Sequence, residues 1–336
     1  MNRARGSNPN MRLVMMGTGS FAEPTFLKLL DSAHSVVGLV TQPDRATGKE
    51  RGSTRQARQG MKEIALQRGI AVLQPESINT PAGVESLKAL APDLLVVAAY
   101  GQILSKDVLG IAASGGINVH ASLLPKYRGA APINWAIYHG EKQSGVTIIR
   151  MSIALDAGDV LVQESLNVLP DETAGDLEAR LAPLGATLAV EMVDKLAMGP
   201  VQGRPQDKSL ATKAPKLTKE HGLIDWSRPA IAVCNQIRAM QPWPTAYTYL
   251  HRAGHEPLRL IVNRTQFSPL PLGEGPGVRA EPGAVVAELA RLLACCGEAW
   301  LEITELQPAG KKRMSAKDFL RGNTIPPNSR MGGPTV

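Results

Sequence analysis

The sequence predicts an α/β fold in which a doubly wound parallel sheet is followed by a small β-barrel. In the first half, short apolar runs alternate with amphipathic stretches, the pattern of a parallel sheet covered by helices on both faces. In the last third, short extended runs are separated by Gly and Pro turns, which is typical of a small barrel. A chain of 336 residues is also long for one domain, so we expect two.

The elements of the first domain can be assigned in order. Strands are expected at residues 11–16, 35–40, 71–73, 94–99, 116–120, 145–151 and 160–168. Helices are expected at 21–30, before Arg68, and at 81–90, 133–138 and 174–198. The last helix is long and amphipathic, as expected of a helix that packs on a sheet.

Changes in composition divide the chain. We expect a flexible N-terminus at 1–10, the α/β domain at 11–198, a linker at 199–215, the barrel domain at 216–321 and a flexible tail at 322–336. The linker is polar, has no apolar period and is broken by Gly203, Pro205 and Pro215. The barrel domain is expected to contain a helix at 231–240, a loop of no fixed structure at 268–283, and strands at 246–250, 258–262, 284–289 and 300–306.

The composition is that of an ordinary globular protein, with 43% hydrophobic and 20% charged residues. No stretch approaches the roughly 18 apolar residues that span a bilayer, and the apolar run at 13–16 is too short for a signal peptide. Cys234, Cys295 and Cys296 have neither disulfide nor metal spacing, which suits a reducing compartment. We therefore expect a cytoplasmic protein without a metal. A formal charge of +7 permits a polyanionic partner.

Two polar side chains mark the end of the expected strand at 116–120. Asn118 and His120 are two residues apart and therefore point to the same side of that strand. An imidazole can polarise or protonate near neutral pH, and an amide can donate to developing negative charge. Asp156, in the turn after the following strand, can reach the same edge and hold the imidazole or act as a general base. The simpler alternatives are a strand-end His with a structural partner and a turn Asp bonded to its own backbone.

A glycine-rich turn follows the first strand. Gly17-Thr18-Gly19-Ser20-Phe21-Ala22 fits the dinucleotide-binding pattern in its Gly/Ala form, and Asp44 follows the second strand. The same six residues also make the tight strand-to-helix turn that any doubly wound sheet needs, and we favour this second interpretation.

Positive charge gathers in two places. The long polar loop after the second strand carries Arg45, Lys49 and Arg51, and Lys311-Lys312-Arg313 form a second basic cluster near the end of the barrel domain. Charge runs are usually solvated surfaces, but a long loop inside a compact domain is usually functional. Two basic patches on two domains would suit a large polyanion such as a folded RNA.

Motifs spread along the chain carry a resemblance to a known family. Residues 118–125 (Asn-Val-His-Ala-Ser-Leu-Leu-Pro), 128–132 (Arg-Gly-Ala-Ala-Pro) and 155–159 (Leu-Asp-Ala-Gly-Asp) resemble the 10-formyltetrahydrofolate-dependent formyltransferases. Outlying motifs at 41–45, 99–101, 224–226, 241–244 and 306–312 resemble the branch of that family that formylates methionine on initiator tRNA. The resemblance covers roughly Arg12 to Arg321, in order and across both domains.

The resemblance implies a Rossmann-like first domain and an OB-like second domain that contacts tRNA. It implies transfer of the formyl group of 10-formyltetrahydrofolate to the α-amino group of methionine on initiator tRNA, for translation initiation, with no need of a metal. The matching catalytic residues are Asn118, His120 and Asp156. The matching folate-binding residues are Ser122, Leu123, Leu124, Pro125, Tyr100, Gly101, Gln102, Ile103 and Gly17. The expected tRNA contacts are Arg45, Lys49, Arg51, Lys311, Lys312 and Arg313.

Nothing in the sequence indicates an obligate oligomer, so a monomer is expected. Three alternatives compete with the tRNA interpretation. A sugar-nucleotide formyltransferase or a formyltetrahydrofolate hydrolase would share the first-domain motifs but would not need the basic cluster at 311–313 or the motif at 241–244. A non-catalytic RNA-binding protein would have no reason to hold Asn118, His120 and Asp156 together. A dinucleotide oxidoreductase would rest on residues 17–22 alone.

Overall fold

The computed structural model describes residues 10–44, 60–268, 280–297 and 299–335. These residues form two compact units. The first contains the chain up to Ile133 together with Lys142–Val168 and Asp176–Lys216, and the second contains Asn134–Glu141, Leu169–Gly175 and the chain from Leu217 onward. Two short excursions of the α/β segment therefore belong to the second unit.

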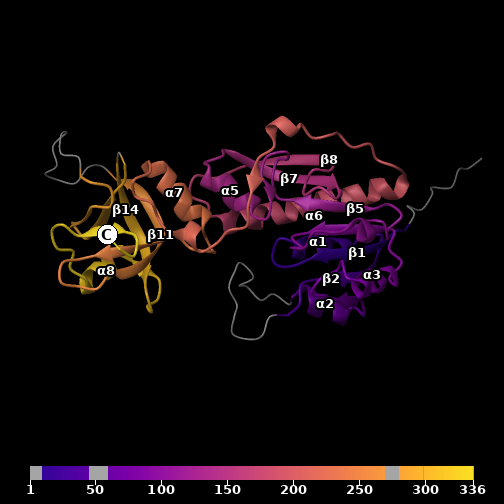
Figure 1. Ribbon diagram of the computed structural model, residues 1–336, viewed down its shortest axis with the longest axis horizontal. Coiled ribbons are helices and arrows are strands. Elements are labelled where there is room, and N and C mark those ends of the chain that lie inside the picture. Colours follow the sequence, from indigo (N-terminus) through magenta and orange to yellow (C-terminus); the bar gives the residue numbers. More distant parts are fainter. Residues whose placement is uncertain (1–9, 45–59, 269–279, 298, 336) are drawn as a thin grey trace, which may run out of the picture. The chain divides into compact units, whose positions relative to one another are not determined.

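A mixed seven-stranded sheet forms the centre of the first unit (Figure 1), with the strand order β3-β2-β1-β4-β5-β7-β8. Its strands are β1 (Arg12–Gly17), β2 (Ser35–Val40), β3 (Ala71–Leu73), β4 (Leu94–Ala98), β5 (Gly116–His120), β7 (Gln143–Arg150) and β8 (Val160–Asn167). The first five are parallel, β7 is antiparallel to β5, and β8 is antiparallel to β7, so β7 alone runs against the other six strands. The predicted parallel sheet is confirmed for five of its strands, and β7 and β8 add antiparallel pairing at one edge. Residues 151–159 join β7 directly to β8, since antiparallel neighbours need no crossover helix.

Helices cover both faces of this sheet. The helices up to residue 198 are α1 (Glu23–Leu30), α2 (Met61–Gln67), α3 (Pro81–Lys88), α4 (Lys106–Leu109), α5 (Pro132–Tyr138) and α6 (Ala174–Met198), and most of α5 belongs to the second unit. On one face, Val14 of β1 packs in a core cluster with Leu87 of α3 and Val108 of α4. On the other, α6 lies so close to the sheet that a Cβ on Gly185 would be 2.8 Å from Cγ1 of Val119. Although α6 has 25 residues, neither it nor any other described helix is long and apolar enough to cross a membrane.

The segment at 199–215, expected to be a linker, is bound to the first unit. It contains η1 (Lys208–Leu210), a single 3₁₀ turn, and β9 (Lys213–Ala214), which pairs in parallel with β6 (Arg128–Gly129). Near its start, the N–H of Val160 donates to the carbonyl of Arg204 at 2.8 Å. Because these contacts are made by backbone atoms, they require no apolar period, and the sequence did not predict them.

The second unit is a nearly closed antiparallel barrel, which confirms the predicted barrel. Its strands are β10 (Tyr247–His251), β11 (Leu258–Ser268), β12 (Val285–Glu288), β13 (Arg291–Cys295), β14 (Trp300–Pro308), β15 (Met314–Ser315) and β16 (Arg330–Gly332), and its helices are η2 (Glu220–Gly222), α7 (Ala230–Ala239) and α8 (Ala316–Gly322). The strand order is β12-β13-β14-β11-β10-β16, and a bridge between Ala284 and Arg330 joins the two edges. The sequence did not predict β13, because it contains no β-branched residue.

The expectation of a flexible tail at 322–336 is wrong where β16 lies. Met331 is 3% exposed, pairs with Leu250 of β10 and donates its N–H to the carbonyl of Gly283 at 2.7 Å. One buried apolar residue in a segment of turn composition makes no periodic pattern, so sequence periodicity did not reveal this strand. Most of the loop expected at 268–283 falls on residues 269–279, which lie outside the described part of the chain.

Candidate active site

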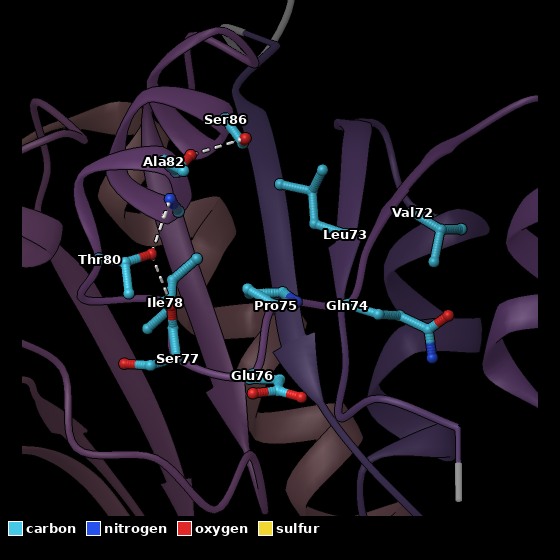
Figure 2. A pocket seen from close by; sticks show the side chains of 11 residues that line it. Val72, Leu73, Gln74, Pro75, Glu76, Ser77, Ile78, Thr80, Ala82 and Ser86 are labelled. Carbon is cyan, nitrogen blue, oxygen red and sulfur yellow. Dashed lines mark hydrogen bonds between the residues drawn. The ribbon is translucent and has the colours of Figure 1, made fainter. Parts of the chain in front are cut away.

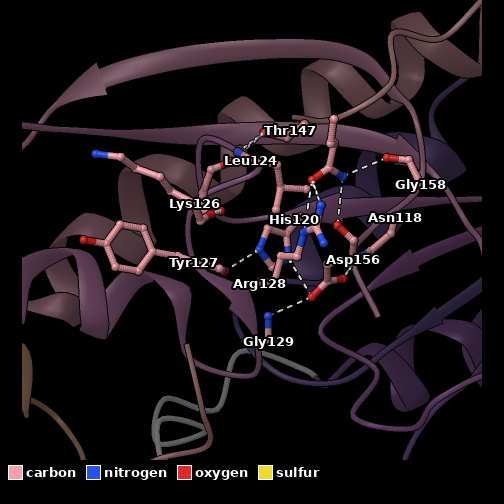
Figure 3. Close-up of polar contacts among 12 residues, drawn as sticks. Asn118, His120, Leu124, Lys126, Tyr127, Arg128, Gly129, Thr147, Asp156 and Gly158 are labelled. Carbon is pink, nitrogen blue, oxygen red and sulfur yellow. Dashed lines mark hydrogen bonds and ion pairs between the residues drawn. The ribbon is translucent and has the colours of Figure 1, made fainter. Parts of the chain in front are cut away.

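Three polar side chains meet at the carboxyl end of β5 (Figure 3). Nδ2 of Asn118 donates to Oδ1 of Asp156 at 3.1 Å, and Nδ1 of His120 lies 3.6 Å from Oδ2 of the same carboxylate. The backbone N–H of Gly129 also donates to Oδ2, at 2.9 Å. The side chains of His120 and Asp156 are only 5% and 9% exposed. The structure thus brings together the three side chains for which the sequence predicted chemistry.

Hydrogen bonding fixes which atom of His120 faces the carboxylate. Nε2 lies 2.9 Å from the backbone carbonyl of Tyr127, and a carbonyl can only accept, so Nε2 carries a proton. Nδ1 therefore faces Asp156, and 3.6 Å is too long for a direct hydrogen bond. Nδ1 and the carboxylate can both still bond to a third group bound between them.

The turn between β7 and β8 sets the direction in which the side chain of Asp156 points. Its φ of +49° lies in the left-handed region, which residues other than glycine rarely adopt. Nε2 of Gln206 donates to the carbonyl of Asp156 at 2.8 Å and to the carbonyl of Gly158 at 2.7 Å. The sequence did not indicate Gln206, because it lies in the expected linker, where no motif or period marked it.

The loop after β5 is held by hydrogen bonds to Thr147 of β7. Oγ1 of Thr147 accepts from the N–H of Leu124 at 3.2 Å and donates to the carbonyl of Ser122 at 2.6 Å. The side chains of Ser122 and Leu124 face the protein, since these residues are 1% and 3% exposed. Leu123 and Pro125 are partly exposed. Of the predicted folate-binding residues in this loop, Leu123 and Pro125 are the two whose side chains can reach a ligand.

Comparison with known proteins identifies the family. Two family models match, "Formyl transferase" over residues 11–193 and "Formyl transferase, C-terminal domain" over residues 216–324. The chain is 44% identical to the methionyl-tRNA formyltransferase of Trichlorobacter lovleyi, over 94% of this chain and 95% of that protein. It is 45% identical to the methionyl-tRNA formyltransferase of Citrifermentans bemidjiense, over 96% of each. The chain belongs to the methionyl-tRNA formyltransferase family.

The fold of this family member also matches solved structures. An N-formyltransferase from Helicobacter canadensis, in complex with folinic acid and dTDP-3-aminofucose, gives a TM-score of 0.63 over 90% of this chain and 100% of that chain, at 15% identity. HypX from Aquifex aeolicus, in complex with tetrahydrofolic acid, gives a TM-score of 0.59 over 93% of this chain and 47% of that chain, also at 15% identity. At these identities the likeness concerns the fold alone. Family membership sets aside the non-catalytic RNA-binding protein and the dinucleotide oxidoreductase.

The segment after β4, which was predicted to bind folate, follows the strand that pairs with β5. Tyr100 is 2% exposed, its hydroxyl has no hydrogen-bond partner among the described residues, and burial raises the pKa of Tyr100 to about 12. Its carbonyl accepts from Nε2 of Gln42 at 2.9 Å. Gly101 has a φ of +82°, and Ile103 is 64% exposed. Because Gly101 has no side chain and that of Tyr100 is buried, Ile103 is the one of these three residues with an exposed side chain.

Gln102, another predicted folate-binding residue, holds a neighbouring loop. Its Oε1 accepts from the N–H of Ile78 at 2.9 Å, and its Nε2 donates to the carbonyl of Glu76 at 3.1 Å. This loop lines an open pocket of about 400 Å³ beside β3 and the start of α3 (Figure 2). None of the predicted site residues lines it, and the hydroxyls of Thr80 and Ser86 bond to the backbone of its wall.

Gly17 is required by the packing of the sheet. A Cβ at this position would lie 2.6 Å from the carbonyl oxygen of Ala98 and 2.7 Å from Cβ of Ala22. Next to it, Oγ1 of Thr18 lies 3.0 Å from Oγ1 of Thr41. The tight-turn interpretation of this glycine-rich stretch therefore accounts for Gly17 without a bound nucleotide.

The predicted tRNA-binding residues are placed only in part. Lys311, Lys312 and Arg313 are exposed, and Nη2 of Arg313 donates to Glu305 at 2.8 Å. The predicted contacts in the long basic loop (Arg45, Lys49 and Arg51) lie outside the described residues. Within the described ranges, no group of three or more His, Cys, Asp or Glu side chains is arranged to hold a metal ion.

Proposed function

We propose that this protein transfers the formyl group of 10-formyltetrahydrofolate to the α-amino group of methionine on initiator tRNA, for translation initiation. The observation that carries the proposal is the meeting of Asn118, His120 and Asp156 at the end of β5. The relatives named methionyl-tRNA formyltransferase, 44% and 45% identical over nearly the whole chain, favour this acceptor over a sugar nucleotide.

Asn118 is proposed to stabilise the intermediate of the transfer. The neutral amine of methionine attacks the formyl carbon, and the formyl oxygen becomes an oxyanion. The amide of Asn118 carries two hydrogens, of which Asp156 accepts one. The second hydrogen is available to the oxyanion, and a donor held in place before the reaction needs no rearrangement during it.

His120 and Asp156 are proposed to transfer the protons of the reaction. The attacking amine must lose a proton, and the folate nitrogen must gain one in order to leave. Asp156 helps to remove the amine proton, which Nδ1 of His120 can carry to the leaving folate nitrogen. Because Nε2 of His120 is bonded to Tyr127, any proton that the ring exchanges with a substrate passes through Nδ1.

The substrates are proposed to lie on the surfaces that the resemblance indicated. The folate would contact the loop after β5 through Leu123 and Pro125, which are partly exposed, and the segment after β4 through Ile103, which is 64% exposed. The tRNA would contact the basic residues at 311–313 and Arg45, Lys49 and Arg51, which follow the second strand in the sequence. The cytoplasmic location, the monomeric state and the lack of a metal stay predictions.

The acceptor can be tested directly. Purified protein is incubated with 10-formyltetrahydrofolate and either methionyl initiator tRNA or a dTDP-amino sugar, and formylated products are measured by mass spectrometry. We expect formyl-methionyl-tRNA and no formylated sugar. Formylation of the sugar without formylation of the tRNA would favour the sugar-nucleotide alternative and overturn the proposal.

A further inference from the structure

We infer that Gln206 is a positioning residue for formyl transfer. It holds the backbone of the turn that carries Asp156 and so sets the direction of that carboxylate. This inference rests on the proposed function, since it assigns Asp156 to the transfer. Gln206 itself would touch neither substrate.

The side-chain amide of Gln206 is bonded on both sides. Oε1 accepts from Nε of Arg128 at 3.1 Å and from Nη2 of Arg128 at 2.7 Å. Nε2 donates to the carbonyls of Asp156 and Gly158, at 2.8 Å and 2.7 Å. The two hydrogens and the oxygen of the amide are therefore all in use, and Figure 3 shows Asp156, Gly158 and Arg128, the three residues that the amide joins.

The turn needs such support because its backbone is unusual. Asp156 has a φ of +49°, a strained conformation for a non-glycine residue that persists only where the surroundings impose it. Two residues later, a Cβ on Gly158 would lie 1.7 Å from the carbonyl of Arg150. The chain there is pressed against the end of β7, and Gln206 fixes the two carbonyls on either side of Ala157.

Gln206 also connects the backbone of Asp156 to the strand that holds its carboxylate. The N–H of Gly129 donates to Oδ2 of Asp156 at 2.9 Å, and the neighbouring Arg128 donates to Gln206. β6 thus fixes Asp156 at two points, the carboxylate directly and the backbone through Gln206. Without the second point the turn can rotate, and the carboxylate moves relative to Asn118 and His120.

Gln206 contributes little to the hydrophobic core. It is half-buried in an irregular segment between the exposed residues Pro205 and Asp207. Its side chain bonds to Arg128 and to the two carbonyls of the Asp156 turn. Removing this side chain should therefore change the geometry of the site more than the stability of the fold.

The test compares three glutamines changed to alanine. We expect Gln206→Ala to lower kcat by about 10- to 100-fold, the effect of a small displacement at a reacting group, with the KM values of both substrates changed less than about threefold. Gln202→Ala is the neutral control, because Gln202 is exposed in the same segment. Gln163→Ala is the contrasting control, because Nε2 of Gln163 donates to Thr147 and the carbonyl of Leu124 in the proposed folate loop, so it should raise the KM of the folate donor.

Gln206→Glu separates positioning from stability. A glutamate can still pair with Arg128 but puts a carboxylate oxygen, which cannot donate, against the two carbonyls, so kcat should fall at least as far as in Gln206→Ala and by more than any decrease in melting temperature explains. A kcat of either Gln206 variant equal to wild type would overturn the inference. So would a decrease in kcat that merely follows a decrease in melting temperature.

A crystal structure of Gln206→Ala tests the inference independently of activity. We expect the Asp156 carboxylate to leave hydrogen-bond distance of Asn118 or of the Gly129 N–H. An unchanged Asp156 would overturn the inference even if the wild-type protein formylates methionyl-tRNA. If the wild-type protein does not formylate that tRNA, the proposed function fails, and the crystal structure still decides whether Gln206 positions Asp156.

Discussion

At the scale of the residue, Tyr100 has a buried side chain, although the family resemblance assigned this residue to folate binding. Its ring packs in the core cluster with Val14 and Leu87, and its hydroxyl has no partner among the described residues. A buried hydroxyl without a partner costs about 1–3 kcal/mol. The side chain of Tyr100 therefore belongs to the core, and its carbonyl accepts from Gln42.

Tyr100→Phe should therefore leave stability at neutral pH unchanged or slightly higher. Because the pKa of Tyr100 is raised from 10.0 to about 12, the native protein keeps the phenol proton at pH values where the unfolded chain releases it. Ionisation of this phenol therefore does not affect the free energy of unfolding of wild type below pH 10, but lowers it as the pH rises towards 12. Urea unfolding at pH 7 and pH 11 should show the variant gaining on wild type at the higher pH; a constant difference would contradict this.

The candidate site was partly predictable at this scale. Asn118 and His120 share a side of a strand because of its two-residue period, and Asp156 lies in a turn that follows the next long strand. Gln206 was not predictable, because its bond to Asp156 joins residues 50 apart and its bond to Arg128 joins residues 78 apart. A single polar residue in an irregular segment produces no repeating pattern in the sequence.

At the scale of the element, β7 anchors the loop after β5. Thr147 is fully buried, and besides its bonds to the backbone of Leu124 and Ser122 it accepts from Nε2 of Gln163 at 2.8 Å. The hydroxyl thus joins β7, β8 and the loop. The shape of the proposed folate surface depends on this antiparallel edge of the sheet.

Thr147→Val keeps the size of the side chain but removes these hydrogen bonds. We expect a decrease of about 2–3 kcal/mol in the free energy of unfolding, since buried partners are left unpaired, and a higher KM for the folate donor. Urea unfolding and steady-state kinetics measure both. Thr187→Val, whose hydroxyl bonds at an exposed place on α6, should cost less than about 0.5 kcal/mol. Equal costs for the two variants would contradict the role of Thr147.

Elements with a strong period were predicted best. The bounds of β2, β3 and α6 agree with those expected from the sequence, because β-branched runs and a 25-residue amphipathic pattern are unambiguous. The reversed direction of β7 and the strands β13 and β16 were not predicted. Strand direction depends on pairing between segments, and short strands such as β16 are recognised only by what they pair with.

At the scale of the whole molecule, two units divide the proposed tasks. The first holds the three polar side chains at the end of β5, and the second carries the exposed basic residues Lys311 and Lys312. A net charge of +7 suits a polyanionic substrate. Binding of tRNA and chemistry should therefore respond to different substitutions.

The double variant Lys311→Ala/Lys312→Ala should weaken tRNA binding and lower its salt dependence by about one unit of slope for each tRNA phosphate that a lysine no longer neutralises. The kcat at saturating tRNA should be unchanged. Fluorescence titration over a range of salt concentrations measures both affinity and slope. The matched control is Lys88→Ala/Lys195→Ala, which removes two exposed charges from the first unit. If this control weakens binding as much, the basic cluster has no specific role.

The most direct test of the proposed chemistry is single-turnover formylation of methionyl initiator tRNA by wild type and by Asp156→Asn, with tRNA affinity measured in parallel. The substitution keeps the size of the side chain, and asparagine tolerates the left-handed backbone. We predict that wild type formylates the tRNA and that the variant binds it equally well but transfers about 10³–10⁴-fold more slowly, as when the carboxylate of another catalytic triplet becomes an amide. A variant that transfers at the wild-type rate would contradict the assignment of Asp156.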